Sequence, residues 1–384
     1  MKFYTNIQLI GNQFLIRGYE NGQHVTHREE WKPTLFVPSR KKTKYKTLEG
    51  ESVEPIQPGF VRDCREFYKK YDEVENFKIY GNDRYVYQYI SEKYPQDRIE
   101  FDIKKIKLVT IDIEVAAEQG FPDVENVAEE LLLISLQDYA TKKVTTFGSR
   151  DFVNKDPNVT YILCRDEVHL LSSFISYWRK NLPEVITGWN SQMYDIPYLA
   201  GRINRVMGEK SMKDLSPWGL VSQGEVYISG RKNITYDIGG VTQLDYLDLY
   251  KRFTYTNQES YRLDYIANYE LGEKKLDHNE YDTFREFYTK DWDKFVRYNI
   301  KDVQLVDRLE DKLKLIELAV TMAFDAKVNF IDIHYQVRMW DTIIYNYLKK
   351  RNIVIPPKKR TSKSQKYAGA YVKEPKPGKY DWVV

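Results

Sequence analysis

Two carboxylates stand side by side in the run LVTIDIEV. Because side chains alternate along a strand, Ile111, Ile113 and Val115 share one face, and Asp112 and Glu114 share the other. Like charges at that spacing repel, so a buried pair needs a compensating cation, and Mg²⁺ or Mn²⁺ with oxygen ligands is the natural candidate. The D-x-E pattern is short and common, however, and it also suits an edge strand whose polar face lies in water.

A third carboxylate, Asp195, lies in TGWNSQMYDIPYL, where a turn gives way to a helix that Pro197 opens. Aspartate just before a helix with an early proline commonly caps the helix amino terminus. The same position also suits a metal ligand, since a carboxylate at a helix start faces outward from the edge of a sheet. The residues alone leave both roles open.

The run YNIKD places Tyr298 and Asp302 four residues apart on a predicted helix. That spacing puts both side chains on one face, one turn apart. A tyrosine hydroxyl can orient a water molecule there while the aspartate holds a cation. The alternative is a surface tyrosine and aspartate with no chemical role.

Strand-like and helical runs alternate around these groups. The apolar runs IKLVTIDIEV, LLLISLQDY, KVTTFGS and VTYILC are interspersed with the helical runs EVHLLSSFISYWRKN and YLAGRINRVMG. This pattern predicts an α/β fold with a central sheet flanked by helices. Residues 1–104 predict a small mixed domain rich in strands. Apolar residues spaced by three and four predict a long helix over 291–320 and another over 334–350.

The composition excludes several classes of protein. The 384 residues are 42% hydrophobic and 15% aromatic, enough to fill the cores of two or three domains. Only Cys64 and Cys164 are present, which excludes a disulfide framework and a thiolate zinc site. There is no signal-peptide pattern, and no apolar run is long enough to span a bilayer. We therefore expect a soluble cytoplasmic protein, in the host cytoplasm if the source is viral, with no membrane partner.

Basic residues are concentrated near the carboxyl end. The formal net charge of +3 is too small to indicate nucleic-acid binding on its own. From Lys349 to Lys379, however, eleven lysines and arginines accompany a single acid, Glu374. This stretch suits either a solvated linker or a segment that contacts phosphates.

The acidic motifs are more specific together than singly. Their order, D-x-E, then N-x-x-x-Y-D, then Y-x-x-x-D, matches the three exonuclease motifs of the DEDD nucleases, in the branch with tyrosine in the last motif. The whole chain resembles the front half of a family B DNA polymerase of the T4-like bacteriophage type. The resemblance also includes GFP after the first motif, LDYLDLYKRFTYTNQESYRLDYI, and YAGAYVKEP, which is similar to the family's Y-x-G-(G/A) segment.

This resemblance implies an RNase H-like exonuclease domain, with a central mixed sheet flanked by helices, at residues 105–314. It would be inserted in a smaller α+β amino-terminal domain made of 1–104 and 315–358. Residues 359–384 would form a basic linker and the start of the palm. The family's palm motifs, D-x-x-S-L-Y-P, the lysine helix and D-T-D-S, do not occur in the sequence, so we expect that this chain alone does not polymerise DNA.

The resemblance also implies a reaction, the hydrolysis of DNA from its 3′ end with two divalent ions, Mg²⁺ or Mn²⁺. Asp112 would bridge both ions. Glu114 and Asp302 would complete the site that holds the attacking water. Asp195 would support the second ion, and Tyr298 would position the water.

Two residues match family positions that contact the terminal nucleotide, Asn190 and Phe121. Phe121 would stack on the base, which suits a frayed single strand because every base offers a π-face. An apolar aromatic residue equally suits a core. The YAGAYVKEP segment, with Tyr367 and Gly369, touches template DNA in the resembling polymerases.

The run EVYISGRKNITYDI predicts a β-hairpin around Gly230, with Arg231 and Lys232 near its tip. In the resembling polymerases a hairpin in this place helps to separate a mispaired primer end from its template. Both basic residues therefore suit contact with DNA, and both equally suit solvated turn charges.

Two other functions are compatible with the motifs. One is a free-standing RNA-processing exonuclease of the DEDD class, although the sequence has no recognised RNA-binding module. The other is a nucleic-acid-binding subunit with an idle nuclease, although all four carboxylates and the tyrosine are present. The partners we expect are a single-stranded 3′ end or primer-template DNA and a polymerase-half chain with palm, fingers and thumb. Residues 380–384 predict a strand that such a palm would pair.

Overall fold

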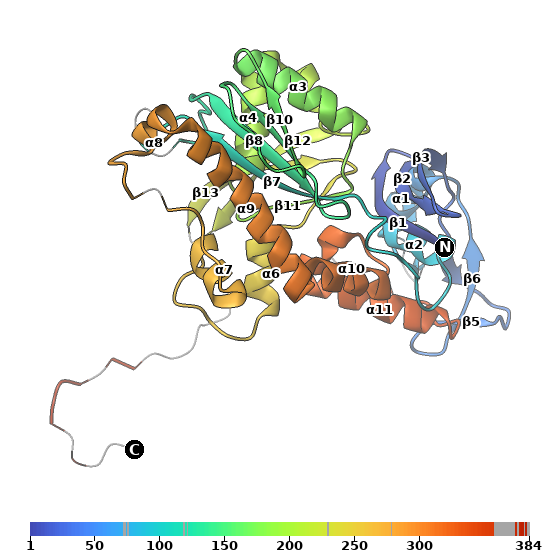
Figure 1. The fold of residues 1–384 in the computed structure, drawn as a ribbon. Helices are drawn as coiled ribbons and strands as arrows, with labels where there is room; N and C mark the ends of the chain where they lie inside the picture. The colour runs from blue at the N-terminus through green and yellow to red at the C-terminus, as the bar shows by residue number, and fades with distance from the viewer. Residues whose placement is uncertain are drawn as a thin grey trace.

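The computed structural model describes the chain except for residues 72, 73, 75, 76, 118, 119, 121, 229, 278, 357–372, 375, 380 and 382–384, and the side chains of Ile228 and Arg231. Phe121, Tyr367 and Gly369 therefore lie outside the described residues, as do most of the basic segment and the strand predicted over 380–384. Figure 1 shows a larger part, mostly green to orange, beside a smaller part drawn in blue and in the orange-red of residues 315–350. Within the described residues no helix is both long and apolar enough to cross a membrane.

A six-stranded sheet lies at the centre of the larger part and confirms the predicted α/β class. Its strands are β7 (Leu108–Val115), β8 (Leu131–Asp138), β9 (Val144–Gly148), β10 (Val159–Leu163), β11 (Val185–Thr187) and β14 (Thr242–Gln243). Their order is β10-β9-β8-β7-β11-β14. The sheet is mixed, because β7 runs antiparallel to β8 and parallel to β11. Strand β7 is thus an inner strand, and its ladder bonds on both sides hold its register.

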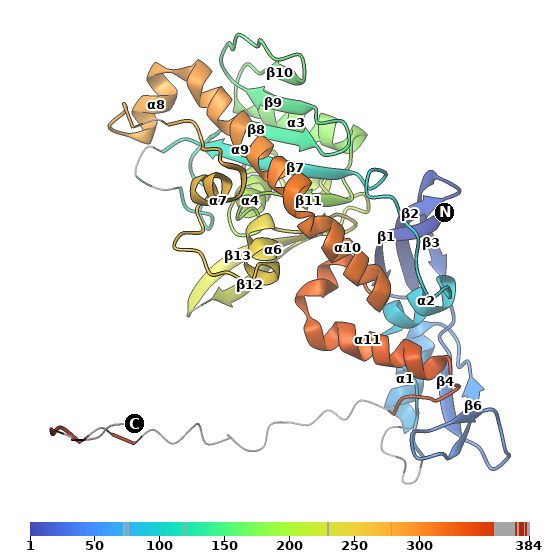
Figure 2. The same cartoon turned by 60° about the horizontal axis from the view of Figure 1, so that its bottom comes forward.

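Helices cover both faces of this sheet (Figures 1 and 2). Helices α3 (Glu167–Lys180) and α4 (Asp195–Met207) share a core with Ile111 and Ile113 of β7. Helices α8 (Phe284–Lys290) and α9 (Trp292–Leu313) share another core with Leu133 of β8. Since the isoleucines of β7 face α3 and α4, strand alternation turns the intervening carboxylates towards α9.

The smaller part contains two antiparallel three-stranded sheets. The chain returns to it after α9, where Phe324 packs against Tyr4 with ring centroids 5.2 Å apart and the Tyr4 hydroxyl donates to the Val328 carbonyl at 2.7 Å. The domain boundaries themselves stay a prediction. The elements of this part are β1 (Lys2–Ile10), β2 (Gln13–Glu20), β3 (Gln23–Glu30), β4 (Leu35–Pro38), β5 (Tyr45–Lys46), β6 (Ser52–Ile56), α1 (Val61–Tyr71), α2 (Tyr85–Lys93), α10 (Leu315–Ala326), η1 (Phe330–His334) and α11 (Gln336–Lys349).

The single helix predicted over 291–320 is two helices in the structure, because the helical conformation is interrupted at Lys314. Lys314 has a left-handed φ of 56° and ends α9, its backbone N–H donating to the Glu310 carbonyl. The buried Glu310 carboxylate accepts hydrogen bonds from the N–H groups of Ile316 at 3.0 Å and Glu317 at 3.2 Å. These bonds satisfy donors in the first turn of α10. Apolar spacing continues through the break, so periodicity does not reveal it.

The predicted hairpin is present as β12 (Val221–Ile228) and β13 (Arg231–Ile238), which pair antiparallel. Gly230 at its tip has a φ of 78°, a conformation that residues with a Cβ rarely adopt. The remaining helices are α5 (Glu209–Lys213), α6 (Tyr246–Phe253) and α7 (Leu263–Leu271).

A buried polar cluster around Glu184 joins the amino-terminal sheet to the central sheet. Glu184, just before β11, is fully buried and accepts hydrogen bonds from the Thr5 hydroxyl at 2.9 Å, the Tyr19 hydroxyl at 3.0 Å and the Lys107 N–H at 2.9 Å. Its Oε1 also lies 3.3 Å from His24 Nε2. Burial acts to raise the pKa of Glu184, but the hydrogen bond from His24 and the neighbouring charges lower it overall. The cluster therefore ties β1 and β2 to the strand beside β7.

Substitution Glu184→Gln tests this joint. An amide group would direct its own N–H donors at hydrogen-bond donors in a buried place, so we expect a loss of about 3 kcal/mol in the free energy of unfolding. The measurement is the urea midpoint at unchanged m-value. The control Glu209→Gln removes an exposed ion pair with Lys213 and should change stability by less than about 0.5 kcal/mol. Equal losses for both variants would contradict the account.

Candidate active site

Strand β7 fixes the positions of Asp112 and Glu114. In the ladder with β8, Asp112 lies opposite Ser135 and Glu114 lies opposite Leu133. The intervening Ile113 is buried in the core beneath α3 and α4. The two carboxylates therefore project from the face of the sheet that α9 covers, as the sequence alternation predicts.

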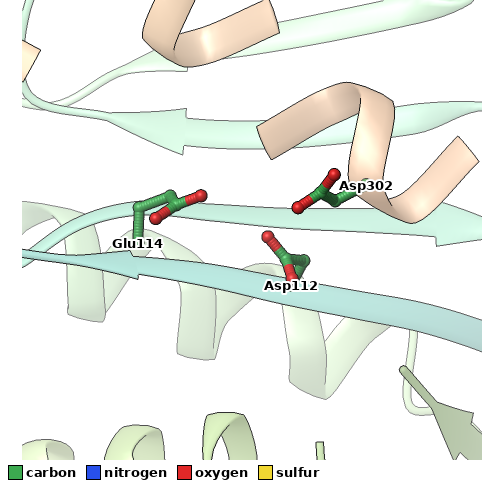
Figure 3. A group of neighbouring side chains, drawn as sticks. All are labelled: Asp112, Glu114 and Asp302. Atoms are coloured by element: carbon green, nitrogen blue, oxygen red, sulfur yellow. The ribbon is translucent and has the colours of Figure 1, made fainter. Parts of the chain in front are cut away.

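Helix α9 brings Asp302 to the same place. One carboxylate oxygen from each of Asp112, Glu114 and Asp302 lies within 4.8 Å of the others, and Figure 3 shows the three groups converging between β7 and the helix. Glu114 and Asp302 are buried, whereas Asp112 is partly exposed. Mg²⁺ and Mn²⁺ prefer oxygen ligands of this kind, so the donor set fits a hard divalent cation.

Asp195 lies beside this group rather than within it. It is the first residue of α4, and the N-cap position belongs to Tyr194, so of the two roles that the residues leave open the structure does not give Asp195 the N-cap position. Its Oδ1 instead accepts a hydrogen bond of 3.0 Å from the N–H of Ile113, the residue between the two carboxylates of β7. The fourth carboxylate is thus held against the strand that carries the first two.

Burial and mutual repulsion raise the pKa values of these groups. For Asp112 burial has the largest effect, followed by the charges of Asp302, Asp195 and Glu114. Burial and the charge of Asp302 likewise raise the pKa of Glu114. Burial raises the pKa of Asp195 to about 7, against the opposing effect of backbone hydrogen bonds. A bound cation would favour the ionised forms and so reverse these shifts.

Lys275 supplies a positive charge inside the cluster. Its Nζ forms an ion pair with Asp302 and donates to the Tyr298 hydroxyl at 3.3 Å. Burial lowers the pKa of this ammonium group, but the charge of Asp302 and further negative groups outweigh burial and raise it, so Lys275 stays charged. Lys275 could not be predicted from the sequence, because nothing in LGEKKLDHN distinguishes one of its two lysines.

Asn299 is a second residue that the sequence analysis missed. It is fully buried, and its Nδ2 donates to Asp112 Oδ2 at 2.5 Å. Tyr298 and Asp302 lie one turn apart on α9, as predicted, and Asn299 is rotated from Tyr298 by one residue. That rotation turns it towards β7, where it orients the Asp112 carboxylate. An asparagine inside the YNIKD motif was the available signal.

Two cavities adjoin the carboxylates. One, of about 560 Å³, is lined by Glu114 and Tyr194 among others. The second, of about 930 Å³, is lined by Asp112, Asn190 and Tyr298 among others. Both are large enough for a nucleotide. The cavities thus bring Asn190, a predicted nucleotide contact, into the same space as two of the predicted catalytic residues.

The hairpin residues do not join this group of contacts. Within the described part of the hairpin, Lys232 forms ion pairs with Glu225 at 2.9 Å and with Glu125 at 3.8 Å. The side chain of Arg231 lies outside the described residues. These pairs agree with solvated turn charges, and contact of Lys232 with DNA stays a prediction.

Comparisons with known proteins add a family to this geometry. Residues 69–266, just over half of the chain, match the family model described as DNA polymerase family B, exonuclease domain. The DNA-directed DNA polymerase of Escherichia phage RB69 is 31% identical over 417 residues, which cover 100% of this chain and 45% of the relative. That of Enterobacteria phage T4 is 31% identical over 403 residues, covering 98% and 44%. A putative DNA polymerase of Frog virus 3 is 28% identical over 57% of this chain and 24% of its own. The chain therefore spans less than half the length of these relatives.

The raised pKa values predict how a metal stabilises the protein at different pH. A carboxyl group whose pKa is raised by folding stabilises the folded state fully only at pH values below its pKa in the unfolded chain. As pH rises through the pKa in the folded protein, which is about 7 for Asp195, this stabilisation is lost. Without metal, the melting temperature should therefore fall between about pH 5.5 and about pH 8. At the higher pH, Mn²⁺ at about 100 times its dissociation constant should add about 2.7 kcal/mol to the free energy of unfolding. The same Mn²⁺ concentration should add much less at the lower pH.

Thermal unfolding with and without MnCl₂ measures this effect. The variant Asp112→Asn with Glu114→Gln is the control, because it keeps the size of both side chains and removes their charge. Mn²⁺ should leave its melting temperature unchanged. Equal stabilisation of the variant, or equal stabilisation at both pH values, would contradict metal binding at this cluster.

Proposed function

Because this chain belongs to the exonuclease-domain family of the family B DNA polymerases, we propose that it hydrolyses DNA from the 3′ end at the cluster of Asp112, Glu114 and Asp302. The family match and the two phage polymerases confirm the resemblance that the motif order predicts. The observation that carries the proposal is that carboxylate oxygens from β7 and α9 meet within 4.8 Å. With Tyr298 on the same helix, we assign the site to the DEDD branch that uses tyrosine.

We assign two divalent cations, Mg²⁺ or Mn²⁺, to this site. Asp112, which has an oxygen within 4.8 Å of both Glu114 and Asp302, would help to hold both ions. Glu114 and Asp302 would complete the position next to the attacking water, and Asp195 would support the other. When bound, divalent cations would lower the pKa of a water molecule and stabilise the departing 3′ oxygen.

The remaining polar groups of the site orient the reactants. The Tyr298 hydroxyl, one turn before Asp302, would accept a hydrogen bond from the attacking water or donate one to it. Lys275 holds that hydroxyl and the Asp302 carboxylate together and offsets negative charge as the phosphate arrives. Attack on phosphorus breaks its bond to the preceding 3′ oxygen. The products are a nucleoside monophosphate and a strand shortened by one nucleotide, with a free 3′ hydroxyl.

The two cavities beside the carboxylates support a single-stranded end as the substrate. Asn190 lines one of them with Asp112 and Tyr298, and we propose that it contacts the terminal nucleotide. A paired end must unstack and unpair before its last phosphate reaches the carboxylates, at a cost of a few kcal/mol. A mismatched end avoids part of that cost, so we propose a proofreading role.

We also propose the domain division inferred above, with an exonuclease domain at 105–314 between amino-terminal segments 1–104 and 315–358. Packing of Phe324 on Tyr4 supports the return of the chain. Leu305 and Leu309 of α9 share a core cluster with Phe3, so the two domains meet through a common core.

The charge-removing variant Asp112→Asn with Glu114→Gln tests the proposed activity. We expect a loss of at least about 100-fold in the rate of mononucleotide release from a single-stranded oligonucleotide in Mn²⁺, because no charge remains on β7 to hold the cations. A label at the 5′ end should report shortening one nucleotide at a time from the 3′ end. Glu209→Gln is the control and should keep the wild-type rate. An active double variant would refute the site, and an inactive wild type would favour an idle binding subunit.

We propose that a polypeptide similar to the remaining part of the relatives covers α11. Val337, Trp340, Ile344 and Tyr347 recur at three and four residues along this helix and are 74%, 62%, 50% and 55% exposed. An apolar stripe of this kind on a helix commonly marks an interface. Figure 2 shows α11 at the front, with no other helix or strand drawn across it. More than half the length of the phage polymerases lies outside the match, so their polymerase part is the occupant we infer.

Photo-crosslinking from Tyr347 tests this surface in the native source. A crosslinking phenylalanine analogue at this position should capture peptides similar to the polymerase part of the relatives, within the same chain or in a second one. The control places the analogue at Tyr269 of α7, which is 56% exposed and should not capture them. Crosslinks only to another copy of α11, or only to unrelated proteins, would overturn the proposal.

A further inference from the structure

The carboxylate of Asp245 joins two segments that are distant in sequence. Asp245 is buried and precedes α6, where its Oδ1 accepts hydrogen bonds from the N–H groups of Leu247 at 2.9 Å and Asp248 at 3.3 Å. The same Oδ1 accepts from the Asn190 N–H at 3.2 Å, and Oδ2 accepts from the Gln192 N–H at 2.9 Å. One side chain thus serves both the start of a helix and the turn that precedes α4.

These bonds exceed what helix capping requires. An N-cap side chain normally accepts from one or two N–H groups of its own helix. Asp166 does this at the start of α3, where it accepts from the His169 N–H at 2.8 Å. Both additional bonds of Asp245 go to the turn at Asn190 and Gln192, which lies on a different element. Oδ2 in particular bonds the turn and takes no part in the capping bonds of α6.

The turn that Asp245 holds contains a residue with a left-handed backbone and passes close to β7. Asn190 has a left-handed φ of 67°, which costs a residue with a side chain more than glycine. Gly188 just before it passes so close to β7 that an added Cβ would lie 2.6 Å from the Ile111 carbonyl oxygen. The Tyr246 N–H donates to the Gly188 carbonyl at 2.9 Å, beside the bonds from Asp245. The backbone of the turn is therefore set by α6 and β7.

We propose that Asp245 is a positioning residue for the DNA end, holding Asn190 where it contacts the terminal nucleotide. This inference rests on the proposed function, which assigns Asn190 to that contact. Asp195 does not depend on Asp245 to the same degree, because the Ile113 N–H holds its carboxylate separately. Loss of the Asp245 bonds should therefore weaken DNA binding more than it slows the chemical step.

Substitution Asp245→Asn removes the bond from the Gln192 N–H to Oδ2, which holds the turn and takes no part in capping α6. Asparagine caps helices as well as aspartate does, so its oxygen can serve α6 while its amide group faces the Gln192 N–H, donor against donor. We expect KM for a single-stranded oligonucleotide to rise about 10-fold, with kcat within about 3-fold of wild type. Asn190→Ala should raise KM by a similar factor. The double variant should have the same KM as Asn190→Ala alone, because both changes remove the same contact with the terminal nucleotide.

Two further variants make the result specific. Asp166→Asn alters an N-cap away from the site and should leave KM unchanged. Asp245→Ser keeps a capping oxygen but cannot reach the turn, so it should reproduce the KM of Asp245→Asn. Independent, multiplying effects of Asp245→Asn and Asn190→Ala would overturn the proposal. So would an unchanged KM, a loss confined to kcat, or failure of both Asp245 variants to fold.

Binding of the same oligonucleotide in Ca²⁺, measured by fluorescence anisotropy, distinguishes this inference from the proposed function. If the wild type binds DNA in Ca²⁺ but does not hydrolyse it in Mn²⁺, while Asp245→Asn binds about 10-fold more weakly, the activity is wrong and the positioning role stands. If the wild type hydrolyses DNA and Asp245→Asn binds with unchanged affinity, the activity stands and the positioning role is wrong.

Discussion

Oxygens of Asp112, Glu114 and Asp302 lie within 4.8 Å of one another, so the packing around them must resist their mutual repulsion. Free in water, such groups would move apart. Here Asp112 and Glu114 cannot, because strand alternation fixes them on one face while Ile111 and Ile113 anchor the other face in a core. The pKa values of Asp112 and Glu114 rise as a consequence, and a cation bound between the carboxylates would stabilise their ionised forms.

The groups around the carboxylates each offset part of that repulsion. Lys275 pairs with Asp302, and Asn299 donates to Asp112. The backbone N–H of Ile113 in β7 donates a hydrogen bond to Asp195. None of these contacts neutralises all the charge, which leaves room for divalent cations. The site is also built mainly on regular elements, a central strand and two helices, whose packing holds the carboxylates more firmly than loops would.

Local periodicity accounts for what could be predicted from the sequence. Alternation along β7 placed Asp112 and Glu114 correctly, and the helical repeat placed Tyr298 and Asp302 on one face of α9. Both inferences concern residues that are near in sequence, where the backbone repeat alone decides which side chains share a face. The order of the three motifs then identified the family, because chain order survives where single short patterns are ambiguous.

Contacts between distant segments could not be predicted in this way. Lys275 reaches Tyr298 from 23 residues away along an irregular segment. The Asn190 N–H donates to the Asp245 carboxylate, 55 residues further along the chain. Both contacts depend on tertiary packing. The contact that holds Asp195 could not be predicted for the same reason, since the Ile113 N–H lies on another element. The end of α9 at Lys314 was missed because apolar spacing continues through the break.

Anomalous scattering from crystals soaked in Mn²⁺ with a short single-stranded oligonucleotide would locate the cations. We expect two peaks about 4 Å apart, both in contact with the Asp112 carboxylate, with the last phosphodiester of the DNA against them. Absence of any peak at Asp112, or peaks only at acidic groups elsewhere on the surface, would contradict this expectation.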